Sequence, residues 1–551
     1  MGKISKVLLL LGVCAFAVGA WAQASDYDSF CERHRAFCTE TFDGTDYQGN
    51  YVGHDEPSLL FYSATKGSGN SNIYFITLPR DPKTLPTQDG TGGTFNFQLH
   101  PAFWFGMAMC DSESSPNFTK TCVPDTDDNI FDDPLSTSPQ WIGHHPGTAF
   151  MEMQFYPPGW VLWPLGSSCD PFMWCAALNI DSLSQSLTQT NNSDCLQVAG
   201  EEPVNFAFIT KDGVPIGPPD PLQATAATTF TPDPTKVLFM NAGDTLKVVL
   251  RDTPAGFRVD IWDLDTGGYG FMTASTANGF AQVLFEPSSS TCHSQPYAFH
   301  PMYATSSEHT RVPWAAHSYN IAFSDEIGHF EYCDAVSNGV CTSKGVNDPG
   351  GLDSDDFDCF GPASSSRVAI GGCTREDSDF DGPTYGNNWP GTLTNPRLDR
   401  TLHARPVRFT SPLFFQREQG NAEDEEKEGN LKNYDRVAFE TNLPSIEGAL
   451  SPPCDRTTGA NCINPPTQFY PIYTTVESEK LEECVWQEGG AHIPGTLNDF
   501  GGTSTAEYGP LLLLNYASAA APGFSARYND FRQVLAHNPC PVKGIDTLLG
   551  R

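Results

Sequence analysis

The stretch LKVVLRDTPAGFRVDIWDLDTGG, residues 246–268, decides the fold class. Every second position is apolar over 246–250 and again over 257–261, which is the period of a half-buried β-strand. The segments at 252–256 and 265–268 combine Asp, Thr, Pro and Gly in a pattern typical of turns. The stretch therefore predicts an antiparallel meander of short strands.

The same alternation continues toward the N-terminus. Residues 204–208 alternate before a Lys-Asp-Gly turn at 211–213. The segment 148–156 predicts a strand with one apolar and one polar face: the apolar face carries Ala149, Met151, Met153 and Phe155, and the polar face carries Glu152 and Gln154. With 49 glycines and 44 prolines among 551 residues, turns are frequent. We expect a mainly β protein with two or more β-sandwich or jelly-roll-like domains and long disulfide-stapled loops.

Changes in composition suggest a division into segments. We expect a signal peptide over 1–22, an N-terminal β-rich domain over 23–200, a β-sandwich meander over 201–290, a His/Cys/Asp-rich segment that resembles metal-binding sequences over 291–400, and a C-terminal loop-rich region over 401–551. Within the last region, residues 528–536 favour a short helix, and the acidic run at 423–426 favours a solvated loop or linker.

The N-terminus has the pattern of a secretory signal. Lys3 and Lys6 precede an apolar stretch over 7–18, and the small-x-small rule for cleavage is met at 20–22 or 22–24. An uncleaved anchor helix is the alternative, but the apolar stretch is shorter than the roughly 20 residues that span a bilayer. We expect a secreted, extracellular or periplasmic protein without membrane insertion. The net charge of −35 excludes nucleic acid and anionic membrane surfaces as electrostatic partners.

The cysteine content agrees with export. Of 17 cysteines, 16 lie beyond the signal sequence, and an even number is compatible with a complete disulfide framework. Six pairs are close in sequence: Cys31/Cys38, Cys110/Cys122, Cys169/Cys175, Cys333/Cys341, Cys359/Cys373 and Cys454/Cys462. The remaining four would pair over longer distances: Cys195, Cys292, Cys484 and Cys540. Metal-binding cysteines are the alternative, but the CxxC spacing common in zinc sites is absent. Two glycosylation sequons begin at Asn117 and Asn191.

Several catalytic signatures are missing from the sequence. It contains no GxSxG elbow, HExxH motif, CxxCH haem box or Walker loop. Common serine esterases, thermolysin-type proteases, c-type cytochromes and nucleotide enzymes are therefore disfavoured.

Acidic loops supply candidate calcium sites. Asp377, Asp379 and Asp381 alternate and are followed by Gly382, so a short loop could wrap a hard cation with oxygen ligands. Weaker candidates are Asp353 with Asp355, and the run 125–129. The alternative for each is a solvated acidic loop without an ion.

Histidines supply a candidate transition-metal site. Imidazole and carboxylate ligands suit copper, iron or zinc. His329 and Glu331 would share a face of a strand, and ligands from other strands would complete the site: His144, His145 and His317. The alternative is that these are ordinary core or capping histidines.

Aromatic residues gather near the strand that carries Glu152. They are Trp141, Trp160, Trp163 and Trp174. Sugar rings stack on such side chains, and a pair of carboxylates can cleave a glycosidic bond. Packing in the core is the alternative for each tryptophan.

Four stretches resemble a family of uncharacterised secreted proteins. They are YVGHDEPSLLFYS (51–63), HPGTAFMEMQFYPPGW (145–160), RDTPAGFRVDIWDLDTGGYGFMTASTANGF (251–280) and WAAHSYNIAFSDEIGHFEYC (314–333). The resemblance implies no activity.

The sequence as a whole favours one function class over two others. We expect a calcium-stabilised secreted protein that binds or degrades an extracellular polymer, in particular a polysaccharide. The alternatives are a copper- or iron-dependent secreted oxidoreductase and a non-catalytic surface or matrix protein. Whether the protein is an enzyme stays open at this point.

Overall fold

The computed structural model describes about two fifths of the chain. The described residues are 58–63, 68–80, 103–114, 121–122, 147–158, 169–182, 184, 189–200, 202–301, 317–319, 333–337, 340–344, 407–415, 431–434, 436–442, 473–478, 480–481, 483–488, 511–512, 530–535 and 538–540.

Ten strands form one antiparallel sheet, called sheet A. Its order is β22–β23–β19–β1–β13–β3–β4–β5–β6, and β12 pairs with β3 beside this path. The strands are β1 (Ser58–Tyr62), β3 (Phe103–Cys110), β4 (Thr148–Tyr156), β5 (Cys175–Ser182), β6 (Val204–Phe208), β12 (His300–Pro301), β13 (His317–Tyr319), β19 (Arg436–Asn442), β22 (Leu511–Leu512) and β23 (Asp530–Leu535).

Nine strands form a second antiparallel sheet, called sheet B. Its order is β20–β21–β16–β2–β7–β8–β9, and β17 pairs with both β2 and β18. The strands are β2 (Ser71–Thr77), β7 (Thr245–Arg251), β8 (Phe257–Asp263), β9 (Tyr269–Ala274), β16 (Arg408–Phe409), β17 (Leu413–Phe415), β18 (Leu431–Asn433), β20 (Tyr473–Ser478) and β21 (Glu483–Glu488).

Two small hairpins and two short helices complete the described structure. The hairpins are β10 (Ala281–Val283) with β11 (Ser294–Pro296), and β14 (Cys333–Ser337) with β15 (Val340–Lys344). The helices are α2 (Ser193–Ala199) and the 3₁₀ turn η3 (Thr276–Asn278). No helix among the described residues is long and apolar enough to cross a membrane.

The predicted meander is confirmed as the strands β7, β8 and β9 of sheet B. Leu250 pairs with Val259 across the β7–β8 hairpin, and the alternating apolar side chains of both strands are fully buried. The turn between them closes where Thr253 and Gly256 exchange backbone hydrogen bonds. Gly256 has a φ of 131°, in the left-handed half of the map where a side chain is strained.

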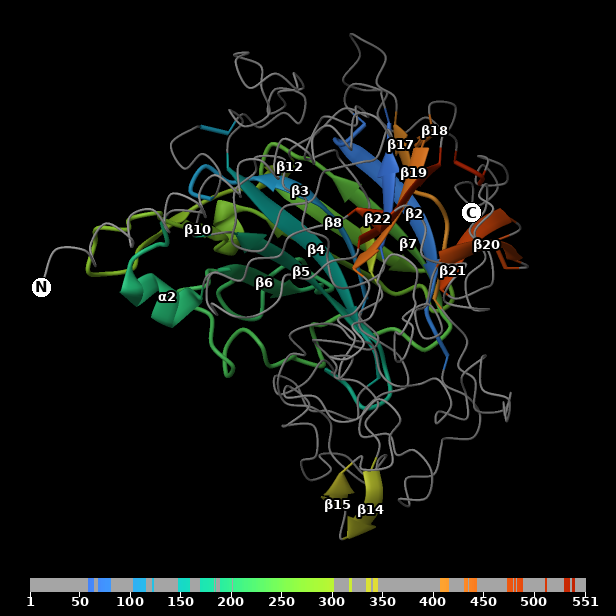
Figure 1. The fold of residues 1–551 in the computed structure, drawn as a ribbon, viewed down its shortest axis with the longest axis horizontal. Helices are drawn as coiled ribbons and strands as arrows, with labels where there is room; N and C mark the ends of the chain where they lie inside the picture. Colours follow the sequence, from blue (N-terminus) through green and yellow to red (C-terminus); the bar gives the residue numbers. More distant parts are fainter. Residues whose placement is uncertain are drawn as a thin grey trace, which may run out of the picture.

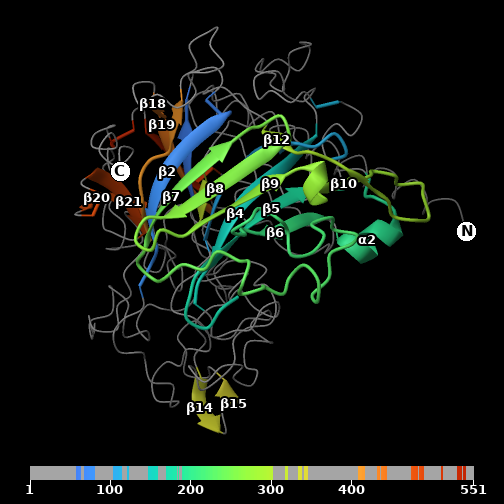
Figure 2. The same ribbon diagram turned by 180° about the vertical axis from the view of Figure 1, so that it is seen from behind.

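The two sheets pack face to face around one core. Tyr74 of β2 stacks on Phe105 of β3 with ring centroids 4.2 Å apart, and Phe409 of β16 meets Phe105 edge-on at 5.1 Å. The main cluster of buried apolar side chains draws on strands of both sheets. Figures 1 and 2 show sheets A and B as layers of one sandwich, with α2 near one end and β20–β21 near the other. The expected mainly β, disulfide-stapled fold is confirmed.

Segments far apart in the sequence share these sheets. β2, at residues 71–77, pairs with β7 at 245–251 and with β16 at 408–409. β1 pairs with β19 over five residues, Ser58 to Tyr62. The sandwich therefore combines strands from the segments 23–200, 201–290 and 401–551.

The helix expected at 528–536 is wrong. Residues 530–535 form β23, which pairs with β19 from Asp530 opposite Asn442 to Leu535 opposite Val437. Pairing with a neighbouring strand outweighs a weak local helix preference, because intrinsic propensity is small beside tertiary contacts.

Four disulfides join the described cysteines. The close pairs Cys110–Cys122 and Cys169–Cys175 are confirmed, and the four cysteines left for longer connections form Cys195–Cys292 and Cys484–Cys540. The other four expected pairs lie outside the described residues or, for Cys333 and Cys341, outside the described side chains. The signal peptide predicted over 1–22 also lies outside the described residues.

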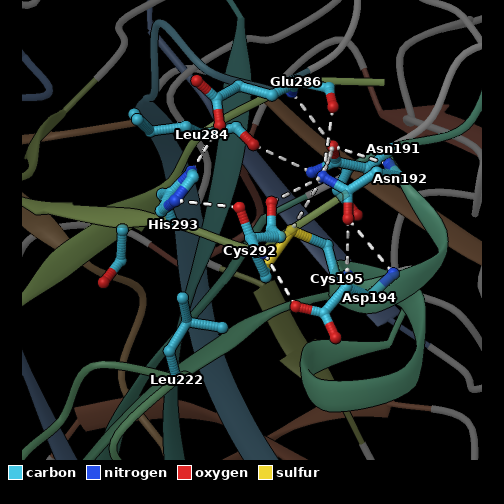
Figure 3. Close-up of a disulfide and its surroundings, with 12 residues drawn as sticks. Asn191, Asn192, Asp194, Cys195, Leu222, Leu284, Glu286, Cys292 and His293 are labelled. Atoms are coloured by element: carbon cyan, nitrogen blue, oxygen red, sulfur yellow. Dashed lines mark hydrogen bonds and ion pairs between the residues drawn. A yellow bond between two sulfur atoms is a disulfide. The ribbon is translucent and has the colours of Figure 1, made fainter. Parts of the chain in front are cut away.

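The Cys195–Cys292 disulfide anchors α2 to the segment before β11 (Figure 3). Asn192 caps the helix: its Oδ1 accepts hydrogen bonds from the backbone amides of Asp194 and Cys195. Its Nδ2 donates to the carbonyl oxygens of Glu286 and Thr291, at 3.1 and 3.2 Å. One buried amide thus ties the helix start to a segment about 95 residues away.

The sequon asparagine Asn191 lies in the same buried node. It is 3% exposed, its Nδ2 donates to the Leu284 carbonyl at 2.9 Å, and its Oδ1 accepts from the Glu286 amide at 3.0 Å. Because the amide nitrogen that would carry a glycan is buried and hydrogen bonded, Asn191 is a structural residue in the folded chain.

Candidate functional site

The predicted metal ligands fall almost entirely outside the described residues. This holds for all three calcium candidates, including the run 125–129, and for most of the histidine site: Asp353, Asp355, Asp377, Asp379, Asp381, His144, His145, His329 and Glu331. His317 is the exception, and only its backbone is described. It begins β13 and pairs with Gly106 of β3, which pairs in turn with Glu152 of β4. These metal sites stay predictions.

The described residues also form a polar face on sheet A whose side chains are mostly buried: Trp104, Gln154, Tyr156 and Asn179 are 2–6% exposed. β4 alternates as expected: Met151, Met153 and Phe155 are fully buried in the core, so Glu152 and Gln154 lie on the opposite face. We call this opposite face of β3, β4 and β5 the polar face. It consists of Trp104, Glu152, Gln154, Tyr156, Asn179 and Asp181.

A chain of hydrogen bonds runs along the polar face. Gln154 Nε2 donates to Glu152 Oε2 at 2.6 Å, and the Tyr156 hydroxyl donates to Gln154 Oε1. Asn179 Nδ2 donates to the Tyr156 hydroxyl at 3.3 Å. A side chain in such a chain has its rotamer fixed by its neighbours, so the polar groups are held in position before any ligand arrives.

An indole ring lies beside this chain of polar groups. Trp104 of β3 pairs with Gln154 of β4, and a Cβ added at Gly106 would come within 2.3 Å of the Trp104 ring. Gly106 therefore leaves the space that the ring occupies, next to the position of Glu152. The polar face thus combines an indole ring, itself 3% exposed, with carboxylate and amide groups.

One group on the polar face has no hydrogen-bond partner. Asn179 is 3% exposed, and its Oδ1 meets no donor among the described residues. A buried amide oxygen without a partner costs roughly 1–3 kcal/mol, so native structures rarely keep one without a reason. A hydroxyl group delivered by a ligand would satisfy it.

Asp111 shows what a structural carboxylate looks like in the same sheet. It is buried and accepts hydrogen bonds from Ser114, Ser182, Gln282 and the amide of Glu113. Burial raises the pKa of Asp111, although these hydrogen bonds act to lower it. With four donors on two oxygens, Asp111 has no unmet hydrogen-bonding capacity of the kind seen at Asn179.

Only part of the polar face can be predicted from the sequence. Alternation in 148–156 placed Glu152 and Gln154 together, but no signal linked them to Trp104, Asn179 and Asp181, which come from other strands. Of the tryptophans expected near Glu152, Trp174 is fully buried and packs against Phe103 at 5.6 Å in the core, while Trp141, Trp160 and Trp163 lie outside the described residues.

Potential metal ligands gather elsewhere in the sandwich. Within the described ranges, one group of three side chains brings carboxylate oxygens within 4.8 Å of one another: Asp244, Asp263 and Asp265 of sheet B and its turns.

Comparison with protein-family models and with curated proteins gave no match. Among solved structures, the full-length tailspike protein 2 from Escherichia coli O157:H7 bacteriophage CAB120 is 11% identical, with a TM-score of 0.15 over 51% of this chain and 23% of the tailspike chain. The enzymatically active domain of bacteriophage CBA120 tailspike protein 2 is 12% identical, with a TM-score of 0.16 over 51% and 28%. The match spans about a quarter of either tailspike chain, and likeness at this level carries no argument about fold or function.

Proposed function

We propose that this is an exported protein that binds an extracellular polysaccharide through the polar face of sheet A. The observation that carries the proposal is the arrangement of Trp104 beside Glu152, with the buried Asn179 Oδ1 left without a donor. A sugar offers an apolar ring face to the indole and hydroxyl donors to the carboxylate and the amide oxygen.

Export is the second part of the proposal. Disulfides form and persist in oxidising compartments, so the described disulfides agree with the N-terminal signal pattern. The strong negative charge also fits an uncharged ligand better than an anionic one, because a polyanion would be repelled.

Hydrolysis of the bound polymer is a second candidate function. Glu152 and Asp181 lie on the polar face of neighbouring strands, and Glu152 pairs with Asn179, two residues from Asp181. The Cα atoms of diagonal neighbours of this kind are about 7–8 Å apart, and their side chains leave the strands on the same face. Carboxyl pairs separated by roughly 5–9.5 Å serve retaining and inverting glycosidases. Release of reducing ends would show this activity.

The test is a polysaccharide array with the purified full-length protein, followed by affinity measurement for the polymers retained. Glu152→Gln keeps the size of the side chain and removes its charge, so the loss of a charged hydrogen bond should weaken binding by about 10- to 150-fold. Asp212→Asn makes a similar charge change at an exposed turn and should bind as the wild type does.

Two results would overturn the proposal. Either no polysaccharide is retained by the wild type, which would favour the surface or matrix protein, or Glu152→Gln binds as tightly as Asp212→Asn. Copper or iron retained in stoichiometric amount would favour the oxidoreductase alternative instead.

A further inference from the structure

Three carboxylates meet at one end of sheet B. Asp244 directly precedes β7, Asp263 ends β8, and Asp265 lies in the turn to β9. Each offers an oxygen within 4.8 Å of the others. Asp244 and Asp263 are 7% and 1% exposed, so two of the three carboxylates are removed from solvent.

Local turns hold these carboxylates in place. Asn241 donates to Asp244 Oδ2 from its backbone and side-chain nitrogens, at 2.7 and 2.9 Å. Asp263 Oδ1 accepts from the amides of Asp265 and Thr266, at 2.9 and 3.0 Å. One oxygen of Asp244 and one of Asp263 are thus fixed by the fold, which leaves the second oxygen of each to point elsewhere.

Two buried oxygens at this place have no hydrogen-bond partner in the described part of the chain. They are Asp263 Oδ2 and the hydroxyl Oγ1 of Thr245, and Thr245 is 2% exposed. The backbone amide of Thr245 donates to Asp265 Oδ2 at 2.6 Å, so Thr245 borders the cluster directly. A buried hydroxyl oxygen and a buried carboxylate oxygen, both without donors, therefore border the same cluster.

The cations nearby leave part of the charge uncompensated. Lys480 Nζ lies 2.5 Å from Asp265 Oδ2 and 3.3 Å from the Gly243 carbonyl oxygen, and Arg80 also donates to that carbonyl. Lys480 and the Thr245 amide both bind Oδ2 of Asp265, so its Oδ1 carries no hydrogen bond among the described residues. Arg80 binds the carbonyl rather than a carboxylate, and Lys480 is the cation among the described residues that forms an ion pair with the cluster, so two of three ionised carboxylates would have no ion pair. Buried charges without a partner are costly.

We propose that Asp244, Asp263 and Asp265 bind one Ca²⁺, with the Thr245 hydroxyl as a neutral oxygen ligand. A divalent ion neutralises the two charges that remain after Lys480 is counted. All the ligands are oxygen, which suits a hard cation, and Ca²⁺ accepts a flexible coordination geometry whereas Mg²⁺ demands a near-octahedral one. Its ligands are different residues from those of the predicted loops at 353–355 and 377–381, and they belong to sheet B and its turns, whereas the polar face belongs to sheet A.

The site would join three strand ends. It would connect the start of β7, the end of β8 and the turn to β9, and through Lys480 it borders the turn between β20 and β21. A bound ion should therefore hold the start of β7, the end of β8 and the turn to β9 together, as any ligand that binds only the folded state stabilises it.

The test counts calcium in the full-length protein. After treatment with chelator, wild type and variants are dialysed against a limiting range of Ca²⁺, and bound calcium is measured by elemental analysis. Asp263→Asn should bind one ion fewer per chain than the wild type. Asp220→Asn is the matched control: Asp220 is 2% exposed, but Leu222, Gln223 and Ser294 donate to it, so its variant should bind the wild-type number.

Melting temperature gives an independent second readout. Without calcium, Asp263→Asn should melt no lower than the wild type, because it removes a buried charge. Addition of calcium should raise the melting temperature of the wild type more than that of Asp263→Asn. Asp265→Asn, at a half-exposed position, gives the same comparison if Asp263→Asn fails to fold. Equal calcium counts for wild type and both variants would overturn the proposal, as would equal calcium-dependent shifts in melting temperature.

Discussion

Replacing Asn192 with Ala should destabilise the contacts between the start of α2 and residues 286–291 by about 3 kcal/mol. The loss of a helix cap costs about 1 kcal/mol. Asn192 also donates to two carbonyl oxygens, of Glu286 and Thr291, and is itself 4% exposed. Each buried acceptor left without its donor adds about 1 kcal/mol at the low end of the usual range.

Asn192→Ser separates the two contributions. Serine is a good helix cap, but its side chain is too short to carry a donor to both carbonyls. The serine variant should therefore keep the cap and lose about 2 kcal/mol. The disulfide Cys195–Cys292 stays in both variants, so the comparison isolates the hydrogen bonds.

Native-state hydrogen exchange is the suitable assay, because a chain of this size is not expected to unfold in one step. The amides of Leu196 and Leu284 donate to the backbone carbonyls of Asn192 and His293, so they keep their acceptors in both variants. They should exchange about 150-fold faster in Asn192→Ala, which corresponds to 3 kcal/mol. Two results would contradict this: an exchange rate in the alanine variant that rises less than about threefold, or a serine variant that exchanges at the wild-type rate. Either result would show that the hydrogen bonds from Asn192 to the carbonyls of Glu286 and Thr291 do not stabilise the fold.

Two further predictions concern buried carboxylates. Asp260 is fully buried and forms ion pairs with Arg258 at 2.7 Å and with Arg251 at 3.0 Å. Asp260→Ala should therefore lower the free energy of unfolding by about 3–5 kcal/mol, measured by denaturant titration; a loss below about 1 kcal/mol would contradict this. Burial raises the pKa of Asp111 above its ordinary value of 3.8, so the folded chain holds this proton more tightly than the unfolded chain does. Its stabilising contribution is then complete below pH 3.8 and is lost as pH rises through the folded pKa. The melting temperature of the wild type minus that of Asp111→Asn should therefore be more positive at pH 3.5 than at pH 7. The reverse order would show that the pKa of Asp111 is lowered instead.

Sequence patterns predicted the local structure where one strand carries the whole signal. The alternation over 246–250 and 257–261 gave correct strands and correct buried faces, because a period of two depends only on neighbours in the chain. The strand 148–156 was predicted correctly for the same reason. The error at 530–535 shows the opposite case, since that segment is a strand only because β19 lies beside it.

The candidate site could be predicted only in part, because it depends on which strands are neighbours. Glu152 was visible as a polar residue on an amphipathic strand. Its proximity to Trp104 and Asn179 follows from the pairing of β3, β4 and β5, and no pattern in one strand encodes that order. The acidic cluster could not be predicted for a related reason. In the sequence Asp265 has the pattern of a turn residue, and Asp244 comes close to it only because β7 and β8 pair.

The central claim is that the polar face binds a polysaccharide, and Asn179→Leu tests it most directly. Leucine fills a similar volume without the amide, whose oxygen has no donor in the described structure. Melting temperature and binding to the polymer selected by the array should be measured on the same sample. Binding should weaken at least tenfold because the ligand loses its acceptor, while the melting temperature changes little: removing the unsatisfied Oδ1 relieves a cost, and losing the Nδ2 hydrogen bond to the Tyr156 hydroxyl adds one. A folded variant that binds the polymer as tightly as the wild type would contradict the claim.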